Sequence, residues 1–203
     1  MIDAYRILSE PSTARLTRLR SRFIARLEPV ETLEEVEAAL ERIAREHHDA
    51  SHVCTAYRLM TPNGPVGYSN DAGEPSGSAG APILQALEGA RIFNVLAAVV
   101  RHFGGKKLGV GGLIRAYADV TTAALETARI VVHHRTVRLA VRFPPEASSA
   151  VMGLIHRHAA RVEAVSYARD GQVTLALPPS DLERFTAELV EASGARAHLE
   201  ELP

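Results

Sequence analysis

The chain has 203 residues, 46% hydrophobic and 23% charged, which is the composition of a globular protein with room for one large or two small domains. Its formal net charge of −1 excludes the global positive field that many nucleic-acid-binding proteins carry, so any contact with nucleic acid has to be local, and we expect no DNA partner. A single cysteine excludes an internal disulfide, and no stretch has the length of a membrane span or the pattern of a signal peptide. We therefore expect a cytoplasmic protein that has no membrane partner.

The first 50 residues predict two strands and one helix. A short strand is expected over residues 4–8 and a longer one over 15–27, where apolar residues alternate with arginines. The helix is expected over residues 32–47, because Thr32 and Glu35 form a capping box before an apolar stripe. The arginine row on the longer strand could follow a phosphate backbone, but pairing with nearby acids is the favoured interpretation. The row consists of Arg18, Arg20, Arg22 and Arg26.

The segment from His47 to Cys54 holds several residue types that bind transition metals. Their spacing matches no closed metal site and no second cysteine is present, so we expect no resident metal. His52 and Cys54 are two residues apart on a predicted strand and would share one face, which favours a buried structural histidine and thiol. A hairpin is predicted next, with strands over residues 53–60 and 66–68 around a Pro-Asn-Gly turn.

Residues 70–80 form a polar loop before a second predicted helix, over residues 81–87. Ser78 is expected to be the N-cap of that helix, because its hydroxyl can accept from a first-turn N–H. Asp71 and Glu74 could act as general acid/base groups or as magnesium ligands. They could equally be carboxylates that support nearby cations, and this interpretation is favoured. The candidate cations are Arg101, Arg115 and the two lysines of the chain.

The nine residues from Gly104 to Gly112 include five glycines, and they lie between a predicted strand over residues 95–100 and a predicted helix. The chain has 21 arginines and two lysines, and both lysines, Lys106 and Lys107, are in this loop. Such a loop lets a ligand approach backbone N–H groups, and the helix N-terminus adds partial positive charge. Alternatively, the glycines serve only tight packing and the lysines only solubility. The pattern matches neither the Walker A nor the dinucleotide-binding motif, so we expect no cofactor.

Residues 1–133 are predicted to form a first domain and residues 134–203 a second one. Asp170-Gly171 is a strong hairpin turn between two of the strands of the second domain, and Ser180 with Glu183 forms another capping box. The resulting βαββαβ order is that of the ferredoxin-like plan. The predicted strands are 137–143, 161–168, 172–177 and 196–199, and the predicted helices begin at Ala147 and Ser180.

Three separated segments, HVCTAY, DAGEPSGSAG and FGGKKLGVGGLIRAY, resemble in their order the signature of the YigZ/IMPACT family, here as a bacterial two-domain member. The resemblance covers the first domain to about Ile130. It implies an α+β protein whose first domain is like the second domain of small-subunit ribosomal protein five, and whose second domain is similar to the last domain of elongation factor G. Both likenesses imply translation and RNA. The eukaryotic relatives regulate a translation-initiation kinase by binding its activator, whereas the bacterial members have no settled activity.

The resemblance and the loop chemistry together identify ligand- or partner-binding positions but no catalytic residue. The chain departs from the family pattern over Asn70-Asp71-Ala72, where the family is usually richer in aspartate, at Ser78 in place of threonine, and at His102 in place of tyrosine. The lost acidic position weakens a bound-metal or carboxylate-pair mechanism. The predicted binding residues are Asp71, Glu74, Ser76, Gly77, Ser78, Arg101, Gly104, Gly105, Lys106, Lys107, Gly109, Gly111, Gly112 and Arg115.

Two classes of function follow from these residues. The first is a translation-associated binding module without enzymatic activity, which presents the basic glycine loop to RNA, to the ribosome or to a regulatory protein. The second is an enzyme that acts on a phosphate- or carboxylate-bearing small molecule, with Asp71 or Glu74 as the acid/base group. The sequence favours the first class, because it contains no nucleophile and base at a recognisable spacing.

Overall fold

The computed structural model describes residues 2–158, 160–167 and 169–202, and these form two compact units. One unit is Tyr5–His133, and the other is the chain from His134 onward together with the residues before Tyr5. Sheets and helices are both present, as expected for an α+β protein. Among the described residues, no helix has both the length and the apolar character that crossing a membrane requires.

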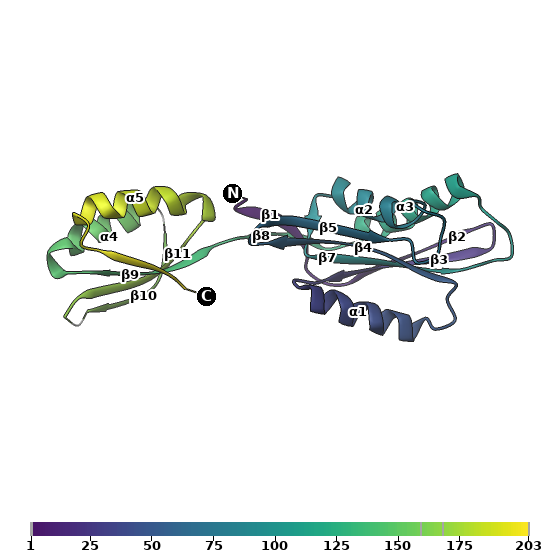
Figure 1. Cartoon of the computed structure of the whole chain (residues 1–203), viewed down its shortest axis with the longest axis horizontal. Coiled ribbons are helices and arrows are strands. Elements are labelled where there is room, and N and C mark those ends of the chain that lie inside the picture. Colours follow the sequence, from purple (N-terminus) through teal and green to yellow (C-terminus); the bar gives the residue numbers. More distant parts are fainter. Residues whose placement is uncertain (1, 159, 168, 203) are drawn as a thin grey trace. The chain divides into compact units, whose positions relative to one another are not determined.

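The first unit is built on an antiparallel sheet of five strands, with helices on both faces (Figure 1). Helix α1 covers one face, and helices α2 and α3 cover the other. In spatial order the strands are β2 (Ser12–Arg18), β3 (Ser21–Pro29), β7 (Val95–His102), β4 (His52–Thr61) and β5 (Gly64–Asn70), and the helices are α1 (Leu33–Glu46), α2 (Gly80–Gly89) and α3 (Val110–Glu126). A second sheet places β1 (Ala4–Leu8) between β6 (Ile92–Phe93) and β8 (Ile130–His134).

The alternation of side chains decides how the sheet is covered. Phe23, Ala25 and Leu27 of β3 are buried against α2 and α3, whereas Ile24 packs toward α1 on the other face. Strand β7 is in the middle of the sheet, so the run from Val95 to Val100 is buried on both faces and needs no polar alternation. Helix α1 begins as predicted, because the Thr32 hydroxyl accepts from the Glu35 N–H at 3.2 Å.

The prediction of one strand over residues 15–27 is wrong, because the chain turns at Leu19 and Arg20. Both residues have positive φ, 45° and 68°, and Arg18 pairs directly with Ser21 across the turn. A two-residue hairpin of this kind usually carries Asn-Gly, which tolerates the left-handed region, so Leu-Arg gave no turn signal.

The arginine row is therefore divided between two strands and a turn, and Arg20 is not part of a strand face. Arg26 contacts Glu28 at 3.1 Å and Glu46 at 2.5 Å, and Arg18 contacts Asp119 at 3.4 Å. For these two arginines the favoured interpretation, pairing with nearby acids, is confirmed.

The second unit has the predicted βαββαβ order and an antiparallel sheet in the order β10-β11-β9-β12, which is ferredoxin-like. The hairpin before Gly171 is present, although residue 168, the end of the predicted strand, lies outside the described residues. The prediction of a capping box at Ser180 is wrong. The Ser180 hydroxyl donates to the Asp3 carboxylate at 2.5 Å, and α5 follows a short 3-10 turn. The elements are β9 (Val137–Phe143), α4 (Ser148–Arg157), β10 (Arg161–Tyr167), β11 (Gly171–Leu177), α5 (Leu182–Ser193) and β12 (His198–Leu202).

We predict that Leu19→Asn raises the free energy of unfolding by up to about 1 kcal/mol, because asparagine tolerates positive φ better than leucine does. Leu19 is half exposed, so the substitution removes little packing. Urea denaturation followed by circular dichroism measures the change. Leu19→Ala is the control and should bring no gain, because alanine has no side chain that favours this region. A lower stability of the asparagine variant would contradict the turn assignment.

Candidate functional site

The glycine loop connects the end of β7 to the start of α3, and the backbone requires glycine at Gly104, at Gly105, which has φ of 81°, and at Gly109. A Cβ on Gly104 would lie 2.1 Å from the carbonyl carbon of Arg20, so only glycine allows this approach, and the Gly104 N–H donates to the Ser21 hydroxyl at 3.1 Å. Gly109 has φ of 70° and is the N-cap of α3. The packing interpretation is therefore correct for Gly104, while the loop between Gly104 and Gly109 remains exposed at Gly105 and the lysines.

Asp71 supplies the cap of α2 from the loop before it. Its carboxylate accepts from the N–H groups of Gly77, Ala79 and Gly80 at 2.7, 2.9 and 2.8 Å. Partial burial opposes ionisation, but these three N–H donors hold the pKa of Asp71 below its ordinary value. Asp71 is therefore a structural carboxylate rather than an available general base.

The prediction that Ser78 caps α2 is wrong. The N-cap residue is Ala79, which has no side-chain acceptor, and Asp71 takes the place of a capping side chain. The buried Ser78 hydroxyl instead donates to the Pro75 carbonyl oxygen at 2.6 Å and closes the loop.

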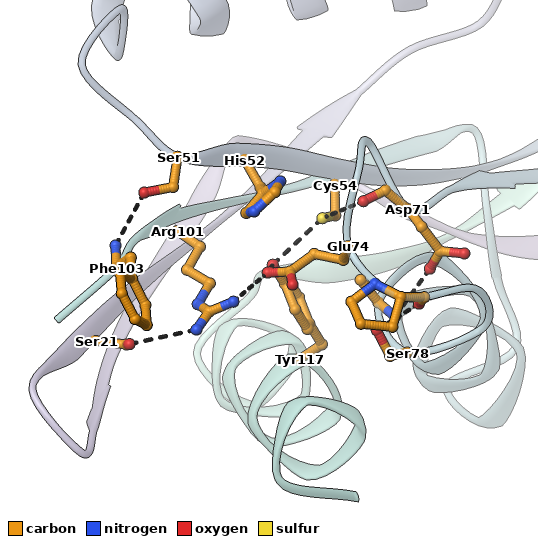
Figure 2. Close-up of polar contacts among 12 residues, drawn as sticks. Ser21, Ser51, His52, Cys54, Asp71, Glu74, Ser78, Arg101, Phe103 and Tyr117 are labelled. Atoms are coloured by element: carbon orange, nitrogen blue, oxygen red, sulfur yellow. Dashed lines mark hydrogen bonds and ion pairs between the residues drawn. The ribbon is translucent and has the colours of Figure 1, made fainter. Parts of the chain in front are cut away.

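Glu74 and Arg101 form a buried ion pair with 2.6 Å between Oε1 and Nη1 (Figure 2). The Tyr117 hydroxyl of α3 donates to the same carboxylate oxygen at 2.7 Å. The guanidinium carbon of Arg101 lies over two aromatic rings, 5.5 Å from the centre of Phe23 and 5.4 Å from that of Phe103. The prediction that Glu74 supports a cation is confirmed for Arg101.

Cys54 is buried under this ion pair, as the sequence predicted. Its sulfur lies 3.0 Å from the Asp71 carbonyl oxygen and 3.2 Å from the Tyr117 hydroxyl. Burial raises the pKa of the thiol to about 12, and burial together with the neighbouring Cys54 and Glu74 also raises the pKa of Tyr117. Both groups stay protonated at neutral pH, so the thiol is not an activated nucleophile.

Sequence reasoning missed Ser21 and Tyr117 as members of this network. Tyr117 is four residues after Leu113 on the apolar stripe of α3, and a phenol on a core-facing stripe requires a hydrogen-bond partner, so a signal was present. Ser21 gave none, because its place depends on the unpredicted turn. His52 is partly buried and its ring nitrogen lies 2.9 Å from the Ala72 carbonyl oxygen. Within the described ranges, no three His, Cys, Asp or Glu side chains come together where a metal ion could be held.

A cavity of about 380 Å³ lies between the ion pair and the glycine loop, and it brings together four predicted residues, Glu74, Arg101, Lys107 and Gly109. A second hollow, of about 450 Å³, lies on the Lys106 side of the loop, next to the Leu19–Arg20 turn. The full lining of the first cavity is His52, Glu74, Pro75, Arg101, Phe103, Lys107, Leu108, Gly109, Val110 and Leu113.

The other predicted residues do not line that cavity. Arg115 is exposed on α3, with a guanidinium nitrogen 3.8 Å from where a Cβ on Gly111 would be. Ser76 and Gly77 are exposed in the loop before α2, and Gly112 packs near Leu108. The predicted positions thus separate into a buried group around Glu74 and an exposed cationic group around the glycine loop.

Comparison with known proteins finds one family model and several relatives that match the chain. Residues 19–125 match the family described as the Impact N-terminal domain. The chain is 38% identical to the IMPACT family member YvyE of Bacillus subtilis (strain 168) over 131 residues, which are 64% of this chain and 60% of that relative. It is 29% identical over 196 residues to the IMPACT family member YigZ of Escherichia coli (strain K12), covering 95% of each. A solved structure described only as that of a hypothetical protein is 27% identical, with a TM-score of 0.69 over 100% of this chain and 99% of that one.

We predict that Asp71→Ala lowers the free energy of unfolding by about 1–2 kcal/mol at neutral pH, because three N–H groups lose their acceptor. The folded-state pKa of Asp71 is lowered, so its contribution is present above the ordinary aspartate pKa of 3.8 and is lost as pH falls through the lower folded value. Urea denaturation at several pH values should show a constant difference between wild type and variant from pH 5 to 8. That difference should shrink below about pH 4, and a difference that grew there would contradict the assignment.

We predict that Arg101→Met lowers the free energy of unfolding by about 3–5 kcal/mol, because it leaves the Glu74 carboxylate buried without its cation. In the double variant Arg101→Met/Glu74→Gln the uncompensated charge is gone, while an acceptor for Tyr117 is kept. Its loss of stability should therefore be smaller than the sum of the two single losses, which a double-mutant cycle of denaturation midpoints measures. Strictly additive losses would mean that the two side chains do not stabilise each other.

Proposed function

Because the chain belongs to the IMPACT family, we propose that it is a translation-associated protein that binds RNA of the ribosome through its exposed glycine loop and the start of α3. The resemblance seen in the three sequence motifs is confirmed by the family match. Its implied likenesses support the proposal, because a domain like the second domain of small-subunit ribosomal protein five and one similar to the last domain of elongation factor G both belong to RNA-rich surroundings.

The observation that carries the proposal is a local excess of exposed positive charge. Lys106, Lys107 and Arg115 are exposed, and none of them forms an ion pair with another described residue. The two acids of the loop before α2, Asp71 and Glu74, are already occupied by backbone N–H groups and by Arg101. The loop therefore presents cations without neutralising carboxylates, which is the local arrangement that phosphate binding needs in a protein of nearly neutral net charge.

The start of α3 adds to this positive potential. Gly109 caps the helix without any side-chain acceptor, and the first turn contains no acidic residue. Unpaired N–H groups at a helix N-terminus carry partial positive charge, which favours a phosphate oxygen nearby. The absence of side chains at Gly109 and Gly111 leaves this backbone open to approach.

The alternative is an enzyme that acts on a phosphate- or carboxylate-bearing small molecule, and the cavity of about 380 Å³ beside Arg101 and Lys107 favours it. The chemistry of the lining opposes it, because Glu74 already accepts from Arg101 and Tyr117 and the Cys54 thiol is protonated. A substrate would have to displace Arg101 from Glu74 before that carboxylate could act as a base. Binding without catalysis is the simpler use of this geometry.

We predict that Lys106→Glu/Lys107→Glu abolishes saturable co-sedimentation with ribosomes or their subunits, because it reverses both loop charges. Binding by the wild type should fall steeply between low and moderate salt, since a few phosphate contacts carry it. The matched control is Arg45→Glu/Arg161→Glu, which makes the same change in net charge at exposed sites on α1 and in the second unit.

The control variant should co-sediment as the wild type does. An equal loss of co-sedimentation in both double variants would indicate only an effect of net charge and would contradict the assignment of the loop. Wild-type protein that stays in the supernatant at every salt concentration would refute the proposal. Binding that survives removal of RNA from the particle would also contradict it and would indicate that the loop binds a protein of the ribosome.

A further inference from the structure

The cavity beside the glycine loop has an apolar entrance next to a lysine. Phe103 and Val110 line it and are 48% and 52% exposed, although each belongs to a residue type that is ordinarily covered. Leu108, Leu113 and Pro75 are the other apolar residues of the lining, and Leu113 is buried. An exposed apolar wall that surrounds a cavity marks a place where a flat or apolar group of a ligand is covered on binding.

The deep side of the cavity is polar and rigid. Glu74 and Arg101 hold each other at 2.6 Å, and His52 is fixed by its contact with the Ala72 carbonyl oxygen. The Arg101 Nε is buried and has no hydrogen-bond partner among the described residues. The floor of the cavity therefore offers charged groups that are already fixed in place, so an occupant has to match both this polar floor and the apolar wall.

A nucleobase meets both requirements at once. Its faces are apolar and stack on an aromatic ring, while its edge carries hydrogen-bond donors and acceptors. The half-exposed ring of Phe103 is the stacking surface, and Arg101, which lies 5.4 Å from the centre of that ring, is the polar group beside it (Figure 2). The cavity of about 380 Å³ is near the lower end of small-molecule sites, so it suits a single base rather than a stacked run.

We propose that this cavity receives one unstacked base of a single-stranded RNA, which stacks on Phe103 while the adjoining phosphate contacts Lys107. The inference rests on the proposed RNA-binding function and specifies its ligand. Lys107 lines the cavity and Lys106 lines the neighbouring hollow, so the loop places one cation at each of the two hollows. A duplex keeps its bases paired and stacked, and therefore offers phosphates to the lysines but no base to the cavity.

The test uses the full chain and a ten-nucleotide RNA with 2-aminopurine at its centre, alone and annealed to its complement. Fluorescence anisotropy of an end label gives affinity, and 2-aminopurine emission reports stacking. The single strand should bind more tightly than the duplex, with a change in emission. Phe103→Ala should weaken single-strand binding by about 5- to 150-fold and leave duplex binding unchanged. Val110→Trp, which fills the cavity from its entrance without removing a charge, should act in the same direction.

Two control variants match these substitutions outside the cavity. Tyr68→Ala removes an aromatic ring that is 49% exposed, and Val66→Trp adds the same bulk to a valine that is 45% exposed, both on β5. Both controls should bind the single strand as the wild type does. Circular dichroism confirms that all four variants are folded.

The outcomes separate this inference from the proposed function. If Lys106→Glu/Lys107→Glu weakens both RNA forms while Phe103→Ala and Val110→Trp change neither, the cavity does not take a base but the loop still binds RNA. If Tyr68→Ala weakens single-strand binding as much as Phe103→Ala does, the cavity inference is also overturned. If the wild type binds neither form of RNA, both proposals fail, and the apolar entrance is left as a surface for a protein side chain.

Discussion

The buried ion pair between Arg101 and Glu74 is the interaction on which the rest of the site depends. It joins the central strand β7 to the loop before α2, and the Tyr117 hydroxyl extends it to α3. Two charges taken out of water are stable only when they are paired at close range and their remaining hydrogen-bonding positions are used. The 2.6 Å contact and the Tyr117 phenol supply these conditions for Glu74, whereas the Nε of Arg101 has no hydrogen-bond partner among the described residues. The same pair forms the floor of the cavity beside the glycine loop.

The carboxylates of the site stabilise the fold, whereas its lysines are exposed on the surface. The carboxylates are used internally, Asp71 to hold the start of α2 and Glu74 to hold Arg101. The loop lysines are left exposed, and no ion pair links them to another described residue. A chain with a net charge of −1 therefore has a local group of exposed positive charges, because Asp71 and Glu74 are already engaged elsewhere.

The glycine loop shows why a residue pattern alone does not reveal its purpose. Gly104 is required because the chain passes within van der Waals distance of the Arg20 backbone, which belongs to a hairpin turn 84 residues earlier. Gly109 is required because the N-cap position of α3 has a positive φ. Close packing therefore explains Gly104 and the positive φ explains Gly105 and Gly109, while the two lysines between Gly105 and Gly109 are exposed. The packing interpretation of the loop is correct for Gly104, and the binding interpretation stays a prediction.

The sequence by itself determined the elements whose signals are local. The capping box of α1, the apolar run of β7 and the βαββαβ order of the second unit follow from periodicity and neighbouring residues, and three motifs identified the family. The turn at Leu19–Arg20 was missed, because its residues adopt positive φ without the usual asparagine or glycine. Only the tertiary structure decided that Asp71 caps α2 and that Cys54, Glu74, Arg101 and Tyr117 meet. These contacts join residues far apart in the chain, and only packing of the sheet against α2 and α3 brings them together.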